Sequence, residues 1–117
     1  MFDEAFRWLP LATLVDKVTL VLHAGVASGL TFEMLEGLPR ANYSMAINRD
    51  GAAKPSHDSR VIETVLWSDP QEKSGCISNK KRGAGCRFGP DVAEEFMRRE
   101  GIELLVRSHE CVMEGIE

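Results

Sequence analysis

Two histidines of this chain each follow a short apolar segment, a position that suits metal or phosphate chemistry. His23 comes directly after the apolar run 18–22, and His109 comes shortly after the run 102–106. If both runs are parallel, neighbouring strands, their carboxyl ends meet at one sheet edge, where α/β proteins bind ligands. The imidazoles would then approach one another, and imidazole is a common ligand for zinc, iron and manganese. The alternative is an ordinary histidine at each strand end, which spacing alone favours.

Two arginines and an aspartate offer further polar chemistry. Arg82 and Arg107 carry a planar fork of donors that suits phosphate oxygens. The alternatives are a solvated basic loop for Arg82 and a surface ion pair for Arg107, and residue type alone favours these. Asp69 precedes Pro70, which biases its backbone toward a turn or extended conformation. Asp69 therefore either shapes a turn or holds a basic partner.

The remaining histidine and the cysteines give weaker signals. His57 lies in a polar stretch, and we expect it to be exposed to solvent. Cys76, Cys86 and Cys111 are odd in number and contain no Cys-x-x-Cys pair, so neither a disulfide framework nor a zinc ribbon is expected. We interpret them as small buried hydrophobes rather than soft metal ligands. A reducing compartment fits this composition: the cytoplasm, with the nucleus as the alternative.

Composition places limits on size and partners. The 117 residues are enough for one modest domain with a packed core. The net charge of -4 argues against a dedicated nucleic-acid binder. The longest apolar run is far too short to span a membrane, and Asp3 and Glu4 stand where a signal peptide would carry positive charge.

Helices and strands alternate along the first forty residues. Apolar residues at helical spacing predict an amphipathic helix over 2–9. Pro10 either kinks this helix or starts a second short turn that runs through Val15. The apolar, β-branched run 18–22 predicts a buried strand, and 32–36 predicts a short helix that ends at glycine.

A long polar segment separates this part of the chain from the next predicted elements. Residues 39–60 have no periodicity and predict a long, mobile loop. The apolar run 61–67 is short enough to be a strand or a helix. A helix is predicted to begin at Pro90 and stop at Gly101, followed directly by a second buried strand over 102–106. A helix that leads into an apolar strand is an αβ unit, so the expected fold class is α/β, with layers of helices and strands.

Taken in order, the motifs of this chain resemble the phosphoprotein phosphatase family of metal-dependent serine/threonine phosphatases. The matching motifs are Leu9-Pro10-Leu11, His23-Ala24-Gly25-Val26, Leu66-Trp67-Ser68-Asp69-Pro70, Arg82-Gly83-Ala84-Gly85, Phe88-Gly89-Pro90-Asp91-Val92 and Arg107-Ser108-His109-Glu110. Within the family, Gly75-Cys76, Asn79 and Gly85-Cys86 look most like the branch that carries EF-hand modules, with the tetratricopeptide-bearing branch second.

The resemblance implies a fold and a set of roles. The fold would be part of a calcineurin-like metallophosphoesterase β-sandwich flanked by helices, with residues 1–117 as one partial catalytic domain. Two divalent ions (manganese, iron or zinc) would activate a water that attacks phosphorus in a phosphoprotein substrate. His23 and His109 would bind one of these ions, Arg82 would hold phosphate oxygens, and Asp69 would lie behind the ligands. Regulatory subunits or modules are the other implied partners.

The chain also departs from the family pattern. The motifs Gly-Asp-x-His-Gly, Gly-Asp-x-Val-Asp-Arg-Gly and Gly-Asn-His-Glu, which supply the family's other ligands, are absent from the sequence. We therefore expect a fragment that is inactive unless the missing half is supplied. The second interpretation is a truncated paralogue or gene-model fragment with a binding role only. A third, a dinucleotide-polyphosphate hydrolase, fits the motifs around Trp67 and Pro90 less well.

Overall fold

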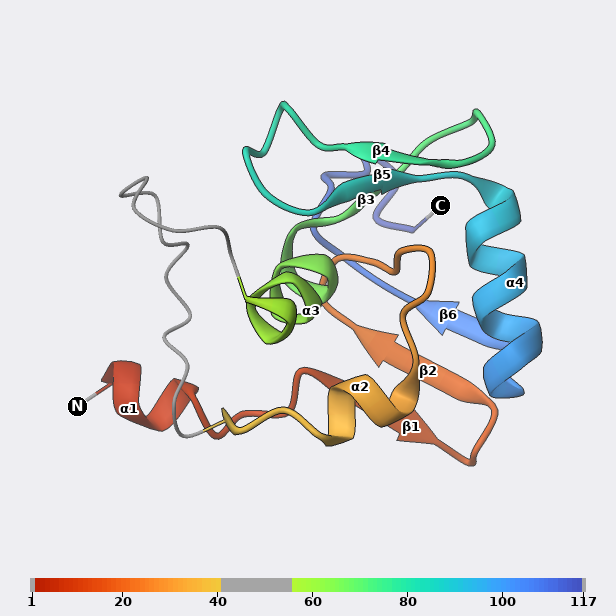
Figure 1. Ribbon diagram of the computed structural model, residues 1–117. Coiled ribbons are helices and arrows are strands. Elements are labelled where there is room, and N and C mark those ends of the chain that lie inside the picture. Colours follow the sequence, from red (N-terminus) through yellow and green to blue (C-terminus); the bar gives the residue numbers. More distant parts are fainter. Residues whose placement is uncertain (1, 41–55, 117) are drawn as a thin grey trace.

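The computed structural model describes residues 2–40 and 56–116, which form two three-stranded sheets and four helices (Figure 1). In chain order the elements are α1 (Phe2–Phe6), β1 (Ala12–Val15), β2 (Thr19–Leu22), α2 (Phe32–Glu36), α3 (His57–Trp67), β3 (Asp69–Pro70), β4 (Cys76–Ser78), β5 (Cys86–Phe88), α4 (Pro90–Glu100) and β6 (Leu104–Val106). The sheets lie at opposite ends of the view in Figure 1, with α3 and α4 on either side of the space between them. This arrangement confirms the expected layered α/β class.

The first sheet has the strand order β1-β2-β6 and positions both candidate histidines. β6 pairs with β2 in parallel, so His23 and His109 leave neighbouring strands at the same edge. β1 pairs with β2 in antiparallel register, and the predicted helical turn through Val15 is therefore wrong. The Val18 amide donates to the Val15 carbonyl and closes the turn between these strands. Asp16 and Lys17 at the centre of this turn are both at positive φ, which is the conformation that matches the twist of a hairpin.

The first sheet is buried on one face only. Leu20 and Leu22 point into the core and are at most 6% exposed, whereas Val21 on the opposite face is 39% exposed. On that outer face Leu104 and Val106 are 53% and 42% exposed. The prediction of a buried strand over 102–106 is therefore wrong for β6, because among the described residues nothing covers this face of the sheet.

The helices begin and end where their capping residues predict. Thr31 accepts a hydrogen bond from the Met34 amide at the start of α2, and Gly37 ends that helix as predicted. Pro90 occupies the first turn of α4, and Gly101 ends it in the left-handed conformation (φ 71°), which confirms the predicted helix.

Most of the predicted loop over 39–60 lies outside the described residues, and its end is helical. Residues 41–55 lie outside the described part of the chain. Ser56 accepts a hydrogen bond from the Ser59 amide and starts α3, so residues 57–60 belong to a helix rather than to the loop. The ambiguous run 61–67 is the rest of that helix.

The N-terminal helix is shorter than predicted and its apolar face is not buried. α1 ends at Phe6, and Pro10 restricts the backbone before it, which is incompatible with continuing the helix. Phe2, Phe6 and Leu9 are 73%, 46% and 53% exposed, so the predicted amphipathic face packs little against the core.

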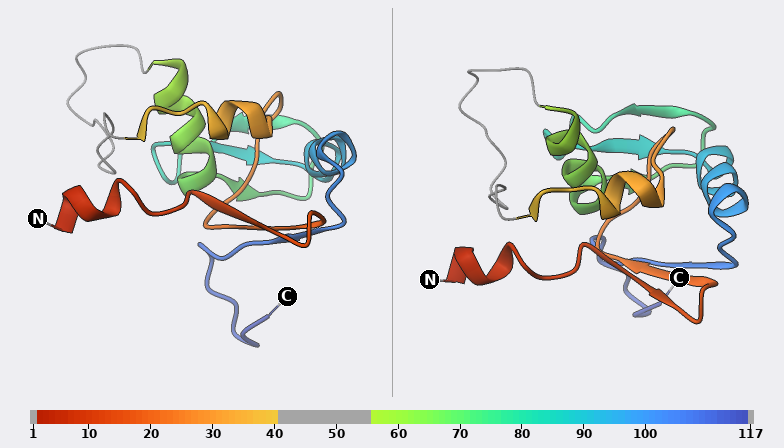
Figure 2. Two further views of the ribbon diagram at one scale, coloured as in Figure 1. Left: turned by 90° about the horizontal axis from the view of Figure 1, so that it is seen from below. Right: turned by 60° about the horizontal axis from the view of Figure 1, so that its bottom comes forward.

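One hydrophobic core connects both sheets with α3 and α4. Its buried members are Leu20, Leu22, Val26, Leu30, Leu38, Val61, Ile62, Val65, Phe88, Val92, Phe96 and Ile102. α2 and α3 lie on the same side of the first sheet (Figure 2). The second sheet, with the order β3-β5-β4, sits at the other end of this core and carries the hairpin from which Arg82 comes. Within the described residues, no helix is long and apolar enough to cross a membrane.

Candidate metal and phosphate site

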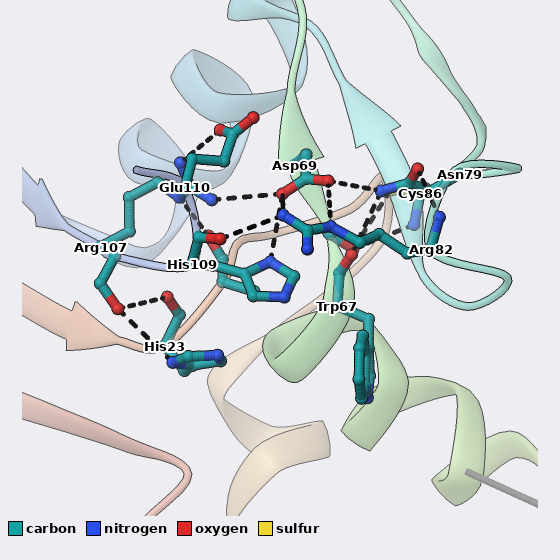
Figure 3. A network of polar contacts seen from close by, with 12 residues as sticks. His23, Trp67, Asp69, Asn79, Arg82, Cys86, Arg107, His109 and Glu110 are labelled. Atoms are coloured by element: carbon teal, nitrogen blue, oxygen red, sulfur yellow. Dashed lines mark hydrogen bonds and ion pairs between the residues drawn. The ribbon is translucent and has the colours of Figure 1, made fainter. Parts of the chain in front are cut away.

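The two strand-end histidines face one another. The ring centroids of His23 and His109 lie 4.8 Å apart, with the rings tilted by 60°. The backbone holds the two loops together, because the Ser108 amide donates to the His23 carbonyl at 3.0 Å. Trp67 packs edge-on against His109, with ring centroids 5.7 Å apart. The sequence prediction that these imidazoles approach one another is confirmed (Figure 3).

Asp69 lies behind this pair and joins the histidine to the arginine (Figure 3). Asp69 is 4% exposed, and its Oδ1 atom lies 3.1 Å from the Nδ1 atom of His109. Nε of Arg82 and the side-chain amide of Asn79 both donate to Oδ2, at 3.0 and 2.8 Å. A carboxylate on Nδ1 leaves Nε2 of the imidazole free for a metal ion, which is a common arrangement behind metal-bound histidines.

The charges around Asp69 fix its protonation state. Burial alone would raise the pKa of Asp69, but hydrogen bonds from Arg82 and Asn79 and the charge of Arg82 outweigh it and lower this pKa. Burial lowers the pKa of His109, and the charge of Arg82 adds to this, while Asp69 opposes both. The site thus combines an ionised carboxylate with a neutral imidazole, which is the form that binds metals.

Arg82 spans the site from the second sheet. Besides Asp69, its Nη2 atom donates to the backbone carbonyl of His109 at 3.0 Å. The hydrogen bond to Asp69 raises the pKa of Arg82, so its charge is permanent. In the described part of the chain, its Nη1 atom has no hydrogen-bond partner, and 26% of the side chain is exposed. One donor of the guanidinium therefore remains available to an anion.

The backbone of His109 is strained. Its φ is 73°, in the left-handed region that residues with a side chain rarely adopt. The bonds that hold it there are those from Arg82 to its carbonyl and from its ring to Asp69. Strain of this kind persists where the surroundings impose it, and it is concentrated at functional sites.

Arg107 forms an ion pair with Glu110 and also contacts the loop that follows His23. Its side chain is 19% exposed, and Nε donates to the Ala24 carbonyl in the loop that follows His23. Nη1 donates to Glu110 at 2.8 Å, and Nη2 lies 3.6 Å from Asp69. The ion pair predicted for Arg107 is therefore present in its contact with Glu110. The same side chain also turns inward and ties the two histidine loops together.

Asn79 belongs to the site, although the sequence did not predict this. Asn79 is 1% exposed, and its side-chain amide reaches both Asp69 and the Trp67 carbonyl. Its backbone carbonyl accepts from the amides of Arg82 and Gly83, which forms the turn that presents Arg82. A lone asparagine in a glycine-rich stretch is a common turn residue, so the sequence signalled the turn but not the buried contact.

The other expected residues are placed as follows. His57 is exposed at the start of α3, as predicted. Cys76 and Cys111 are exposed and Cys86 is half-buried, so the prediction of buried cysteines fails for the first two, which lie on an edge strand and in the C-terminal segment. A pocket of about 510 Å³ opens beside His23 and His109, and its walls include Leu9, Leu11, Leu66 and Trp67.

The histidine pair supplies part of the ligand set that one metal ion needs. Two imidazoles with a carboxylate behind one of them suit a first-row metal, but a catalytic metal needs at least three protein ligands. Within the described residues, no group of three or more histidine, cysteine, aspartate or glutamate side chains is placed to hold an ion. The described part of the chain therefore does not complete a dimetal site.

Comparison with known proteins identifies the family. The calcineurin-like phosphoesterase family matches residues 1–113. The chain belongs to this family. It is 35% identical over 118 residues to the serine/threonine-protein phosphatase rdgC of Drosophila melanogaster, covering 98% of this chain and 18% of that protein. It is 30% identical over 138 residues to the serine/threonine-protein phosphatase with EF-hands 1 of Rattus norvegicus, covering 100% of this chain and 22% of that protein.

A solved structure shows the same fold. The chain superposes with a TM-score of 0.70 on a protein serine/threonine phosphatase from Saccharomyces cerevisiae that is similar to human phosphatase PP5, at 32% identity. The match covers 94% of this chain and 31% of that one. The resemblance to phosphoprotein phosphatases is thus confirmed, and the chain spans about a fifth of the length of the curated relatives given above.

Proposed function

We propose that this chain forms part of the active site of a serine/threonine protein phosphatase, which hydrolyses phosphoserine and phosphothreonine in proteins. The observation that carries the proposal is the contact network in which Asp69 joins His109 to Arg82 beside His23. This network brings a metal-binding imidazole pair and an anion-binding guanidinium together at one sheet edge. The relatives are named as serine/threonine phosphatases, which supports the same chemistry.

Each residue has a separate role in this proposal. His23 and His109 bind one divalent ion, manganese, iron or zinc, with Asp69 holding the His109 ring by Nδ1. Arg82 offers its remaining Nη1 donor to a phosphate oxygen of the substrate, and Asp69 and the His109 carbonyl fix the direction of its guanidinium. The metal pair, when bound, supplies an activated water and stabilises the charge that develops on the phosphate.

A second candidate is a non-catalytic chain with a binding role only. The observation that favours it is that the described residues supply two imidazoles and no third ligand beside them. The two candidates share the histidine pair and differ in whether further ligands reach it from other residues or another chain. They therefore differ in turnover rather than in metal binding.

Metal binding is tested by nuclear magnetic resonance on protein labelled only at histidine. We expect Mn²⁺ to broaden the ring signals of His23 and His109 together, at lower concentration than those of His57, which is exposed on α3. The variant His23→Gln should remove the preference at His109, because a single imidazole holds the ion poorly. Equal broadening at all three histidines, or broadening at His57 first, would contradict the proposal that His23 and His109 bind the ion together.

Turnover is measured on the same samples with a phosphoserine peptide and Mn²⁺. We expect no hydrolysis above the metal-containing buffer, because the described residues do not complete a dimetal site. Hydrolysis that is lost in His109→Asn would show that the chain assembles a working site by itself, and would rule out the binding-only candidate.

A further inference from the structure

We propose that Cys76 and Cys86 form a reversible disulfide when the protein is exposed to hydrogen peroxide. This disulfide would alter the loop that carries Arg82. The two residues lie on β4 and β5, which pair in antiparallel register with Cys76 opposite Phe88 and Ser78 opposite Cys86. Cys76 and Cys86 are therefore diagonal neighbours on one face of the hairpin. This inference does not depend on the proposed phosphatase activity.

The two thiols are neighbours on the hairpin and differ in exposure. Both cysteines are free, and Cys76 lies diagonally across the strand pair from Cys86. Cys76 is exposed, so an oxidant reaches it from solvent, while Cys86 is half-buried. Burial, with a smaller contribution from the neighbouring Cys76, raises the pKa of Cys86 to about 12, so Cys86 keeps its proton while Cys76 is the accessible thiol.

Forming the disulfide requires a small backbone movement, which the structure allows in strand β4 but not in β5. Diagonal neighbours have Cα atoms about 7–8 Å apart, slightly beyond the usual reach of a disulfide. β4 is the edge strand of its sheet, and Cys76, Ile77 and Ser78 are all exposed, so this strand can shift toward β5. β5 is held in place, because Phe88 is 4% exposed in the core. A disulfide between residues that lie this far apart is strained, so we expect it to be easily reduced.

The chemical steps balance with hydrogen peroxide as oxidant. The Cys76 thiolate attacks one peroxide oxygen, the O–O bond breaks, and Cys76 becomes a sulfenic acid as hydroxide leaves. The Cys86 sulfur then attacks the Cys76 sulfur, the S–S bond forms, and the S–O bond breaks. The leaving hydroxide takes the Cys86 proton and departs as water. Two thiols and one peroxide thus give one disulfide and two waters.

Oxidation of Cys86 would disturb the candidate site through its present contacts. Its thiol donates to the Val26 carbonyl and lies 3.6 Å from the Ser68 hydroxyl, next to Asp69. The residues between the two cysteines include Asn79 and Arg82, which both bind Asp69. A covalent link across this hairpin therefore acts on the same loop that presents Arg82.

The test uses peptide mapping of the oxidised 117-residue protein. Trypsin separates the cysteines, placing Cys76 in residues 74–80, Cys86 in 83–87 and Cys111 in 108–117. After brief treatment with hydrogen peroxide and blocking of free thiols, we expect 74–80 joined to 83–87, with two hydrogens lost and full recovery by dithiothreitol. A mixture of ¹⁵N-labelled and unlabelled protein should give only links within one chain.

Matched variants complete the test. Cys76→Ser and Cys86→Ser should each abolish the link, whereas Cys111→Ser should leave it unchanged. Cys76 is exposed, so Cys76→Ser is expected to fold even if Cys86→Ser does not. The proposal is overturned if the main product joins Cys111, links two chains, or is a sulfinic acid that dithiothreitol does not reverse. It is equally overturned if Cys76 and Cys86 stay unlinked when Cys111 oxidises.

Discussion

Replacing Asp69 with asparagine is expected to lower the free energy of unfolding by about 2–3 kcal/mol, which is a large part of the stability of a small domain. Asp69 is 4% exposed and accepts hydrogen bonds from Arg82 and Asn79 while contacting His109. Asparagine keeps the shape but removes the charge, so Arg82 loses its ionic partner. The loss is smaller than the ~3–5 kcal/mol of a fully buried broken pair, because a quarter of Arg82 remains in water.

Urea unfolding in metal-free buffer measures this loss. Glu94→Gln is the matched control, since it removes a carboxylate from an exposed position on α4 and is expected to change stability by less than about 0.5 kcal/mol. If Asp69→Asn were as stable as Glu94→Gln, the network around Asp69 would not contribute to folding, and the argument that it positions His109 and Arg82 would fail.

The stability difference between wild type and Asp69→Asn is also expected to depend on pH. The pKa of Asp69 is lowered in the folded state, so its contribution to stability is present above the ordinary carboxyl value of 3.8 and is lost as the pH falls below it. Wild type should therefore lose its advantage over Asp69→Asn as the pH falls through this range. A constant difference between the two proteins down to acid pH would show that the ionisation of Asp69 is not what stabilises the fold.

The second large effect is expected from Gly85→Ala, at about 2–4 kcal/mol of lost stability. Gly85 has a φ of 67°, and an added Cβ would lie 2.8 Å from the Trp67 carbonyl carbon and 2.9 Å from the Ser68 nitrogen. Both atoms belong to backbone, so the clash is relieved only by moving the segment that leads into Asp69. The left-handed φ adds a penalty of its own for any residue with a side chain.

Gly101→Ala separates these two causes. Gly101 has nearly the same φ, 71°, but an added Cβ there meets nothing within 4 Å. We expect Gly101→Ala to lower the free energy of unfolding by only about 1 kcal/mol, which is the penalty for the left-handed conformation alone. The difference between the two variants in urea unfolding then measures the close packing of Gly85 on Trp67 and Ser68 at the end of α3. Equal losses would mean that the Trp67–Gly85 contact is not tight in solution.

Several elements follow from local sequence because their signals are local. Pro90 and Gly101 bracket α4, and Phe32 to Gly37 forms the predicted short helix, since proline at the start and glycine at the end act on the backbone nearby. The run 61–67 stayed ambiguous, because a short apolar run fits a helix or a strand until its start at Ser56 is known.

The exposed outer face of the first sheet could not be predicted from the sequence. The run 102–106 reads as buried because it is apolar, and apolar residues favour burial wherever a covering layer exists. Whether a layer covers Leu104 and Val106 depends on segments remote in sequence, and none of the described residues supplies one. The strand was therefore predicted correctly and its burial was not.

The sequence by itself determined the family, the order of the motifs and the two histidines at strand ends, because each depends on residue type and spacing along the chain. Only the tertiary structure decided that Asp69 joins His109 to Arg82, that Arg107 turns inward and that Asn79 is buried among them. These contacts link residues from both sheets across the core. Long, flexible side chains choose their partners by which neighbours the fold brings within hydrogen-bond distance, and the sequence carries no local signal for that choice.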